Sequence, residues 1–289
     1  MPALVWAVHR ELESSPLQSW LFTRLTRDFA VSVEPGPSPE ARFPRFGPYD
    51  ERLGYAEIPG FLAALGEAGF VVDRQARLSP SFVSFIDLGA FPVYREKSQA
   101  GLGIRDRSER AIYRVRHPER VFPDFESIPP VVVGTLLFVE NRELLDLTHP
   151  TRNPAVEWDR FAAASLNALV SAVLRTGQRF GGSTLATQIE KYRHSPEGRT
   201  GSPVEKLRQI VTASARAYRD GSDTSAARRR IVVDYVNSTP LSARPGFGEV
   251  IGLGDGLHTW YGTDLDELVR RLSEPPADAA ARVGQAEVY

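Results

Sequence analysis

Hydrophobic residues recur at helical spacing in two stretches of the chain. Near the N-terminus Leu17, Leu21 and Leu25 lie four residues apart, and Trp20 and Phe29 extend the same stripe. A second stripe consists of Trp158, Phe161, Ala162, Leu166, Leu169 and Val173. Apolar residues that repeat every three or four positions line one face of a helix. Both stretches are therefore predicted to be amphipathic helices.

Signals for helix ends mark the C-terminal half. Residues 202–205 read Ser-Pro-Val-Glu, a capping box with proline at the first helical position, which predicts a helix start. This helix is expected to reach Gly221, with an apolar stripe of Val204, Leu207, Val211 and Tyr218. A further helix around Tyr235 is expected to end at Pro240, because proline cannot continue it.

The first 125 residues mix helix and strand patterns. Residues 33–50 are rich in Pro and Gly and predict a loop. Residues 58–69 predict a short helix, residues 70–77 a strand, and residues 101–116 a hairpin. The sequence therefore predicts an α+β chain. A mixed α/β N-terminal region covers residues 1–125, a mainly α-helical domain covers 126–275, and a tail covers 276–289.

Composition narrows the class of protein. The 289 residues are 42% hydrophobic and 25% charged, which is typical of a globular protein. A net charge of −1 argues against binding nucleic acid through bulk charge. There are no cysteines, so disulfides and thiolate metal sites are excluded. No apolar run approaches the roughly 20 residues of a membrane span, and the first residues lack the pattern of a signal peptide.

A glycine-rich turn opens one predicted helix. Gly181 and Gly182 precede Ser183 and Thr184, and Ser183 is expected to be the N-cap. Backbone amides at a helix N-terminus bind anions well. Cations follow along the chain at Lys191, Arg193, Lys206 and Arg208. Together they suit a diphosphate, although each cation alone is more often a solvated surface charge, and the turn alone is more often a cap.

Glu140 follows the apolar run from Val131 to Val139, so the chain carries a carboxylate to the edge of its core. Burial raises the pKa of a carboxyl group and makes it a usable base near neutrality. The alternative is the first polar residue at a helix end, which is the commoner situation.

Five segments occur in the order and spacing of the family 51 glycosyltransferases. They are VENRELLD (139–146), GGSTLATQIEK (181–191), VEKLRQ (204–209), RRRIVVDYVN (228–237) and GFGEVIGLGDGLHTWYG (246–262). This resemblance, over about residues 126–275, is to the peptidoglycan glycosyltransferase domains of class A penicillin-binding proteins and monofunctional transglycosylases. The most specific motif is the second, in which Gln188 and Lys191 match the family.

The resemblance implies a lysozyme-like helical core that polymerises lipid II by inverting transfer and releases undecaprenyl diphosphate. Glu140 matches the catalytic base. Gly182, Ser183, Thr184, Gln188, Lys191, Lys206 and Arg208 are the implied substrate and diphosphate ligands. The implied partners are lipid II, the growing glycan chain, the membrane surface and other cell-wall synthesis proteins. The implied location is the outer, periplasmic face of the bacterial cytoplasmic membrane, through an anchor not visible in this sequence.

Three positions depart from the family pattern. Asn141 replaces an Asp, Glu205 replaces an Arg, and Gln209 replaces the second Glu of the third motif. Gln209 is kept as a catalytic candidate, but it removes the charge that would orient a divalent cation such as Mg²⁺ or Mn²⁺; no residue is assigned as a metal ligand. Residues 147–158 form a longer insertion that contains His149, Arg152 and Asn153.

Two alternatives to a polymerase stay open. The fold is consistent with a module that holds lipid II or glycan without chemistry, which Gln209 favours and Glu140 opposes. It is also consistent with a hydrolase on a lysozyme-like core, which no residue favours.

Overall fold

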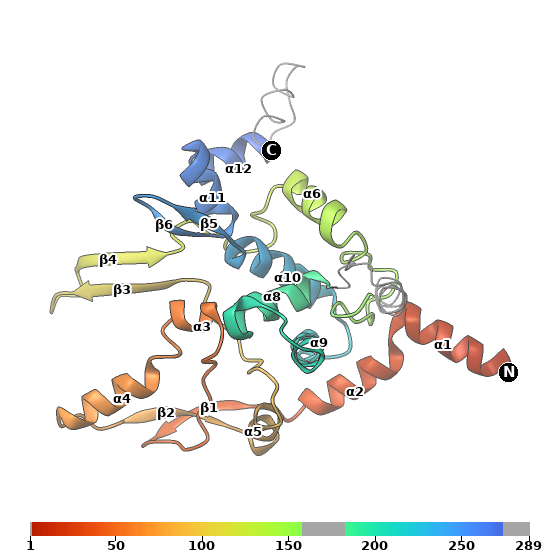
Figure 1. Cartoon of the computed structure of the whole chain (residues 1–289), viewed down its shortest axis with the longest axis horizontal. Helices are drawn as coiled ribbons and strands as arrows, with labels where there is room; N and C mark the ends of the chain where they lie inside the picture. Colours follow the sequence, from red (N-terminus) through yellow and green to blue (C-terminus); the bar gives the residue numbers. More distant parts are fainter. Residues whose placement is uncertain (1, 158–182, 274–289) are drawn as a thin grey trace. The chain divides into compact units, whose positions relative to one another are not determined.

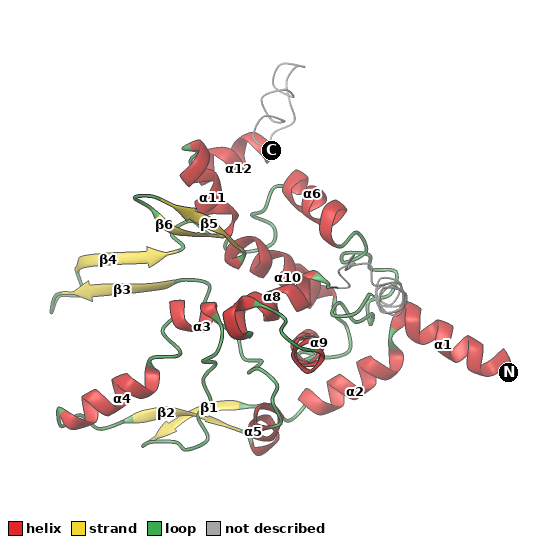
Figure 2. Ribbon diagram, in the orientation of Figure 1, coloured by secondary structure: helices red, strands yellow, loops and turns green. Residues whose placement is uncertain are grey.

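The computed structural model describes residues 2–157 and 183–273 (Figure 1). The fold is α+β, as predicted, with helices and small antiparallel sheets (Figure 2). The chain forms two compact units, one of Met1–Glu96 and Leu144–Arg228, the other of Lys97–Glu143 and Arg229–Tyr289. The predicted division at residue 125 stays a prediction. The helical stripe predicted over residues 158–173 and the predicted tail lie outside the described residues.

The first unit is built mainly of helices. Its elements are α1 (Pro2–Ser14), α2 (Pro16–Thr26), β1 (Val31–Pro35), α3 (Pro48–Arg52), α4 (Ile58–Glu67), β2 (Arg74–Leu78), α5 (Pro80–Asp87), α8 (Leu185–His194), the 3-10 turn η1 (Pro196–Gly198) and α9 (Pro203–Ala217). Strands β1 and β2 pair antiparallel, with Val31 opposite Leu78. The strand predicted over residues 70–77 begins only at Arg74, so the prediction was wrong for its first four residues.

The core of the first unit is aromatic. Phe29, Phe82 and Phe85 are buried together with Leu78, Val93 and Ala215. The rings of Phe29 and Phe82 stack with centroids 4.7 Å apart, a geometry that stabilises beyond simple area burial. The predicted N-terminal helix is present as α2, but most of its stripe is exposed: Leu17 is 69% and Trp20 62% exposed. Only Phe29, beyond the helix end, reaches the core.

Residues of the sequence insertion connect helices of the first unit. Asn153 is buried, and its side-chain amide donates to Gln18 Oε1 on α2 and to Ser214 Oγ on α9, both at 2.9 Å. The carbonyls of His149 and Arg152 accept hydrogen bonds from Arg228. The Asn153 side chain therefore has a structural role, and His149 and Arg152 contribute through their backbone carbonyls.

The second unit combines two hairpins with helices. Its elements are β3 (Ala100–Arg105), β4 (Ala111–His117), α6 (Pro130–Glu140), β5 (Pro240–Arg244), β6 (Gly248–Ile251), α11 (Gly252–Tyr261) and α12 (Leu265–Ser273). The chain enters it for the second time within α10 (Ser225–Ser238). The predicted hairpin at 101–116 is confirmed as β3 and β4. The hairpin β5–β6 was not predicted.

Asn237, the last residue of the fourth motif, has a structural role. Its side chain accepts a hydrogen bond from Phe122 N and donates one to Phe122 O. Nearby, Gly252 has a φ of 74°, and a Cβ there would lie 2.6 Å from the carbonyl oxygen of Asn237. Only glycine fits this backbone conformation and this close approach.

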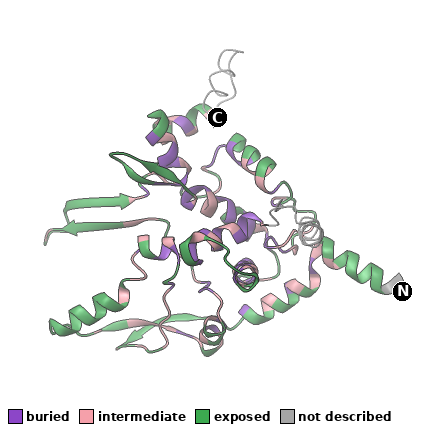
Figure 3. Cartoon of the chain, in the orientation of Figure 1, coloured by how far each residue is buried: buried purple, intermediate pink, exposed green. Residues whose placement is uncertain are grey.

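Buried residues gather in α8, α9 and α10, whereas α1 and α4 are mostly exposed (Figure 3). Within residues 2–157 and 183–273, no helix has the length and apolar character needed to cross a membrane.

Candidate functional site

Helix α8 begins with a reciprocal cap. Thr184 Oγ1 accepts from the amide of Thr187, and Thr187 Oγ1 accepts from the amide of Thr184. The N-cap is therefore Thr184, and the prediction that Ser183 caps the helix was wrong by one residue. Gly181 and Gly182 lie outside the described residues, so the predicted contribution of Gly182 stays a prediction.

Ser183 is instead bound by a lysine from the next helix. Lys206, in the first turn of α9, donates from Nζ to Ser183 Oγ at 2.8 Å and lies 3.5 Å from Thr187 Oγ1. The starts of α8 and α9 therefore meet. The structure brings Ser183, Thr184 and Lys206 together, and their role as substrate or diphosphate ligands stays a prediction.

The charge of a second lysine, Lys191, acts on Lys206. Burial, and then the positive charge of Lys191, lower the pKa of Lys206 to about 8. Only three of the 35 basic residues in the chain are lysines, and the third is Lys97. A lysine is a compact point charge with movable donors, suited to a phosphate. An anion beside both ammonium groups would offset their mutual repulsion, so this is a candidate anion site.

Two other predicted cations are used by the fold. Arg208 pairs with Glu205 Oε2 at 3.2 Å and lies over the ring of Phe91. Arg193 is 3% exposed and pairs with Glu96. Arg193 therefore cannot meet a diphosphate, which corrects its interpretation as a cation of that site. A diphosphate contact by Arg208, or by the half-buried Gln188, stays a prediction.

Gln209 is fully buried in a chain of hydrogen bonds. Its Nε2 donates to Ser195 Oγ at 2.9 Å and to Thr200 Oγ1 at 3.0 Å. The Ser195 hydroxyl in turn donates to Glu205 Oε1 at 2.6 Å. The predicted capping box is half confirmed: Ser202 Oγ accepts from the amide of Glu205, but the Glu205 carboxylate bonds Ser195 and Arg208.

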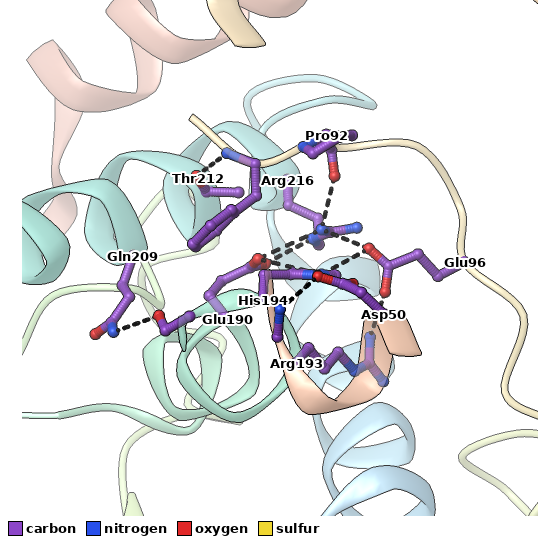
Figure 4. A network of polar contacts seen from close by, with 12 residues as sticks. Asp50, Pro92, Glu96, Glu190, Arg193, His194, Gln209, Thr212 and Arg216 are labelled. Atoms are coloured by element: carbon purple, nitrogen blue, oxygen red, sulfur yellow. Dashed lines mark hydrogen bonds and ion pairs between the residues drawn. The ribbon is translucent and has the colours of Figure 1, made fainter. Parts of the chain in front are cut away.

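The C-terminal end of α8 is held by a buried network of charges (Figure 4). His194 Nδ1 lies 2.7 Å from Asp50 Oδ1, and its Nε2 lies 2.9 Å from Glu96 Oε1. Arg216 on α9 binds Glu190 through Nε at 2.7 Å and Glu96 through Nη2 at 3.1 Å. The side chains of Asp50, Glu96, Glu190 and His194 are at most 2% exposed.

The charges in this network stabilise one another. Burial alone would lower the pKa of His194, but the carboxylates of Glu96, Asp50 and Glu190 outweigh it and raise this pKa to about 9. Burial likewise opposes ionisation of Glu96, yet His194, Arg216 and Arg193 hold its pKa well below the usual range. The histidine is thus a cation at neutral pH.

Glu140 lies in the second unit, as the last residue of α6, and is half-buried. The residues directly before it, Phe138 and Val139, are exposed, so α6 leaves the core before it reaches the carboxylate. Burial, and then the charge of Glu140, raise the pKa of Tyr235 on α10. The structure thus places Tyr235, a residue of the fourth motif, close to Glu140.

Comparison with protein families gives one match. The family model described as Transglycosylase matches residues 108–274, more than half of the chain. The chain belongs to the transglycosylase family. These are the family 51 peptidoglycan glycosyltransferase domains, so the resemblance seen in the motifs is confirmed. The transglycosylase is therefore a glycosyltransferase of peptidoglycan and cell-wall synthesis. A search of curated proteins finds no match.

The divalent cation that the family resemblance suggests finds no fitting donor set in the described part of this transglycosylase. Gln209, at the family's carboxylate position, offers an amide that is already hydrogen-bonded. Glu205 is tied to Ser195 and Arg208. Across residues 2–157 and 183–273 no group of three or more His, Asp or Glu side chains is arranged to hold a metal ion.

Sequence reasoning missed Asp50, Glu96 and His194. Asp50 and Glu96 come from the region before the transglycosylase match. The available signal was in α8 itself, where Glu190 lies within the specific motif and Arg193 and His194 follow it on the same short helix. Three ionisable residues at such spacing cannot all face solvent when the helix is buried, so they needed partners.

Proposed function

We propose that the transglycosylase polymerises lipid II into glycan chains with inversion at the donor carbon and releases undecaprenyl diphosphate. The observation that carries this proposal is Lys206, bound to the Ser183 hydroxyl just before α8 and within reach of the charge of Lys191, which lies further along that helix. A leaving diphosphate needs positive charge that is in place before the bond breaks. The two lysines and the helix N-terminus supply it.

In the proposed reaction Glu140 acts as the base. Its carboxylate takes the proton from the C4 hydroxyl of the acceptor GlcNAc as that oxygen forms a bond to C1 of the donor MurNAc. The bond from C1 to the diphosphate oxygen breaks on the opposite face, and its electron pair leaves with undecaprenyl diphosphate. One base suffices, because the leaving group departs as an anion stabilised by charge and not by a proton.

A second candidate is a module that binds lipid II or glycan without catalysing transfer. Gln209 favours it, because this side chain replaces a family carboxylate and both of its polar atoms are engaged by Ser195 and Thr200. The half-buried carboxylate at Glu140 and the lysine pair favour the polymerase.

We further propose that the protein works at the outer face of the bacterial cytoplasmic membrane, where a lipid-linked donor would be presented. Helices α1 and α2 carry exposed Trp6 and Trp20, each with an arginine, Arg10 or Arg24, over its ring. Tryptophan and arginine on an exposed apolar helix suit a lipid–water interface. Sedimentation with phospholipid vesicles should be reduced in the double variant Trp6→Ser/Trp20→Ser; unchanged sedimentation would remove this support.

Polymerisation of fluorescently labelled lipid II, followed on gels, tests the proposed activity. The expected result is glycan product that depends on Glu140 and Lys206. Binding of lipid II without product, under conditions where another family member makes product, would establish the binding module instead. Absence of both binding and product would refute both functions.

A further inference from the structure

Glu96 joins the two helices of the candidate anion site. Its Oε1 lies 2.9 Å from His194 Nε2 and 3.1 Å from Arg216 Nη2, and its Oε2 lies 3.4 Å from Arg193 Nη1. His194 and Arg193 belong to α8, and Arg216 belongs to α9. One carboxylate therefore binds three cations from both helices (Figure 4).

The backbone that carries Glu96 is itself fixed along α9. Arg216 donates to the carbonyls of Pro92 and Tyr94, and Thr212 Oγ1 accepts from the amide of Phe91. The Arg219 guanidinium donates to the carbonyl of Val93. Glu96 is thus presented by a strap, residues 91–96, that α9 side chains hold at several points.

Asp50 holds the same end of α8 from a third element. It lies in α3, and its Oδ1 meets His194 Nδ1 at 2.7 Å while its Oδ2 accepts from the amides of Phe46 and Gly47. The carboxylate is 1% exposed. Asp50 is therefore anchored to its own loop on one side and to α8 on the other.

These contacts control where the lysines lie. Helix α8 is 10 residues long, or about 15 Å, with Lys191 three positions before His194. At the start of the two helices Lys206 binds Ser183, and further along Arg216 binds Glu190 and Glu96. A short helix fixed at both ends by its partner has little freedom to shift, so the separation of Lys191 from Lys206 is set by the network.

We propose that Asp50 and Glu96, which lie outside the family match, are positioning residues for glycosyl transfer that hold α8 against α9 and so keep Lys191 and Lys206 together at the diphosphate site. The role in catalysis rests on the proposed function. The placement of Lys191 beside Lys206 does not, because it can be measured without turnover.

The charge count of the network makes the inference specific. The carboxylates of Asp50, Glu96 and Glu190 face His194, and the rings of Tyr49 and Phe91 lie against the imidazole. Arg193 binds Glu96, and Arg216 binds both Glu96 and Glu190. Three carboxylates balance two guanidinium groups and one imidazolium. Neutralising the carboxylate of either Asp50 or Glu96 therefore favours loss of the proton from His194.

The first measurement follows Lys206 directly. The ε-amino groups are dimethylated with ¹³C, which gives three lysine signals that Lys→Arg variants assign. In the wild type Lys206 is expected to titrate near 8 because of burial and the nearby Lys191. In Glu96→Gln and Asp50→Asn the helices can separate, and its pKa is expected to rise toward about 10.4, the value of a free lysine. Glu96→Asp, which keeps the charge, should restore most of the wild-type value.

The second measurement is the kcat/KM for lipid II as a function of pH. For Asp50→Asn we expect a ratio to wild type near one at pH 6, where His194 is protonated, and at least tenfold lower at pH 8.5. A purely structural role would lower the melting temperature without this change of ratio. Asp87→Asn is the matched control, because Asp87 lies in the same region but is 53% exposed and paired with Arg42; it should behave as wild type.

The outcomes separate the two proposals. A folded Glu96→Gln or Asp50→Asn with a wild-type Lys206 titration and a wild-type pH profile would overturn the positioning role. If Glu96→Gln does not fold, Asp50→Asn decides by the same two readouts. If the wild type makes no glycan at all, the proposed function fails, while a shifted Lys206 titration in the variants would still support the positioning of α8.

Discussion

Lys206 Nζ lies 2.8 Å from Ser183 Oγ, which joins the first turn of α9 to the residue just before the cap of α8. The Ser183 hydroxyl does not cap the helix, and it contacts a lysine whose pKa is lowered to about 8. The pairing explains why the serine and threonine of the motif have separate roles. Thr184 stabilises the helix, and Ser183 orients a cation.

Lys206 should control diphosphate affinity and its pH dependence. We expect Lys206→Gln to weaken binding of a prenyl diphosphate about 10- to 100-fold, the worth of a charged hydrogen bond. Wild-type affinity should fall as the pH rises through about 8, because Lys206 loses its proton. Lys206→Arg stays charged and should abolish this dependence. Calorimetric titration at pH 7 and 9 checks both, with Lys97→Gln as the control; a Lys206→Gln variant that binds normally would make Lys206 a surface charge.

Glu140→Gln should lower lipid II polymerisation by about two to four decades, because a positioned base contributes that much. The substitution keeps shape and hydrogen bonding, and the half-buried site should tolerate it, so the melting temperature should hardly change. Glu143→Gln, an exposed carboxylate nearby, serves as the control. Full polymer yield from Glu140→Gln would rule out this residue as the base.

The cap of α8 gives a paired stability test. Thr184→Ala removes the acceptor for the amide of Thr187 and should lower the free energy of unfolding by roughly 1 kcal/mol. Ser183→Ala, one residue earlier, should leave stability unchanged and weaken diphosphate binding instead, because it releases Lys206. Urea denaturation of both variants distinguishes them. Equal destabilisation by the two would contradict the assignment of Thr184 as the cap.

Gln209→Glu should destabilise the protein by about 1–3 kcal/mol, the cost of leaving buried polar groups unsatisfied. Nε2 of Gln209 donates to two hydroxyls, and a carboxylate has no such donor; it would also lie one hydroxyl away from Glu205. Denaturation at pH 7 measures the loss, and Gln209→Met separates the effect of charge from that of volume. A more active Gln209→Glu enzyme of normal stability would show instead that position 209 takes part in catalysis.

His194 should make stability depend on pH. Its pKa is raised from the ordinary value of 6.5 to about 9, so its contribution is complete below 6.5 and declines as the pH rises toward 9. Between pH 6 and 8 this amounts to about 2 kcal/mol, at 1.36 kcal/mol for each pH unit. The comparison stops at pH 8, because above it the lowered pKa of Lys206 acts in the opposite direction. Urea denaturation should show the decline in the wild type and not in His194→Gln.

The sequence predicted the elements whose signals are local. The capping serine before α9, the hairpin at 101–116 and the α+β class follow from turn residues and periodicity, and they are present. The family resemblance assigned Ser183, Thr184 and Lys206 to one binding site, and the structure brings Lys206 to Ser183. Their role in binding stays a prediction. Glu140 as the base and Gly182 as a ligand stay predictions.

What the sequence did not predict depends on partners far along the chain. In the sequence Arg193 and Lys191 are both cations near the end of the same predicted helix. In the structure Arg193 is buried against Glu96, whereas the charge of Lys191 acts on Lys206. Spacing along a helix cannot tell which charge meets a carboxylate 97 residues away. For α2 the difference is the reverse: its apolar stripe is mostly exposed. Apolar periodicity predicts that a helix has an apolar face, but not whether other residues cover that face.

Gly47 brings α3 so close to the end of α8 that a Cβ there would lie 1.9 Å from the carbonyl oxygen of Arg193. This contact, together with Asp50, means that the recognisable family stretch, which starts at residue 108, is not a piece that can be cut out and expected to fold. A chain shortened to that start would lack Asp50 and Glu96, and would keep only Glu190 of the three carboxylates that face His194. We therefore expect a substitution at position 47, 50 or 96 to limit which residues positions 193 and 194 can accept, so these sites should vary together among relatives.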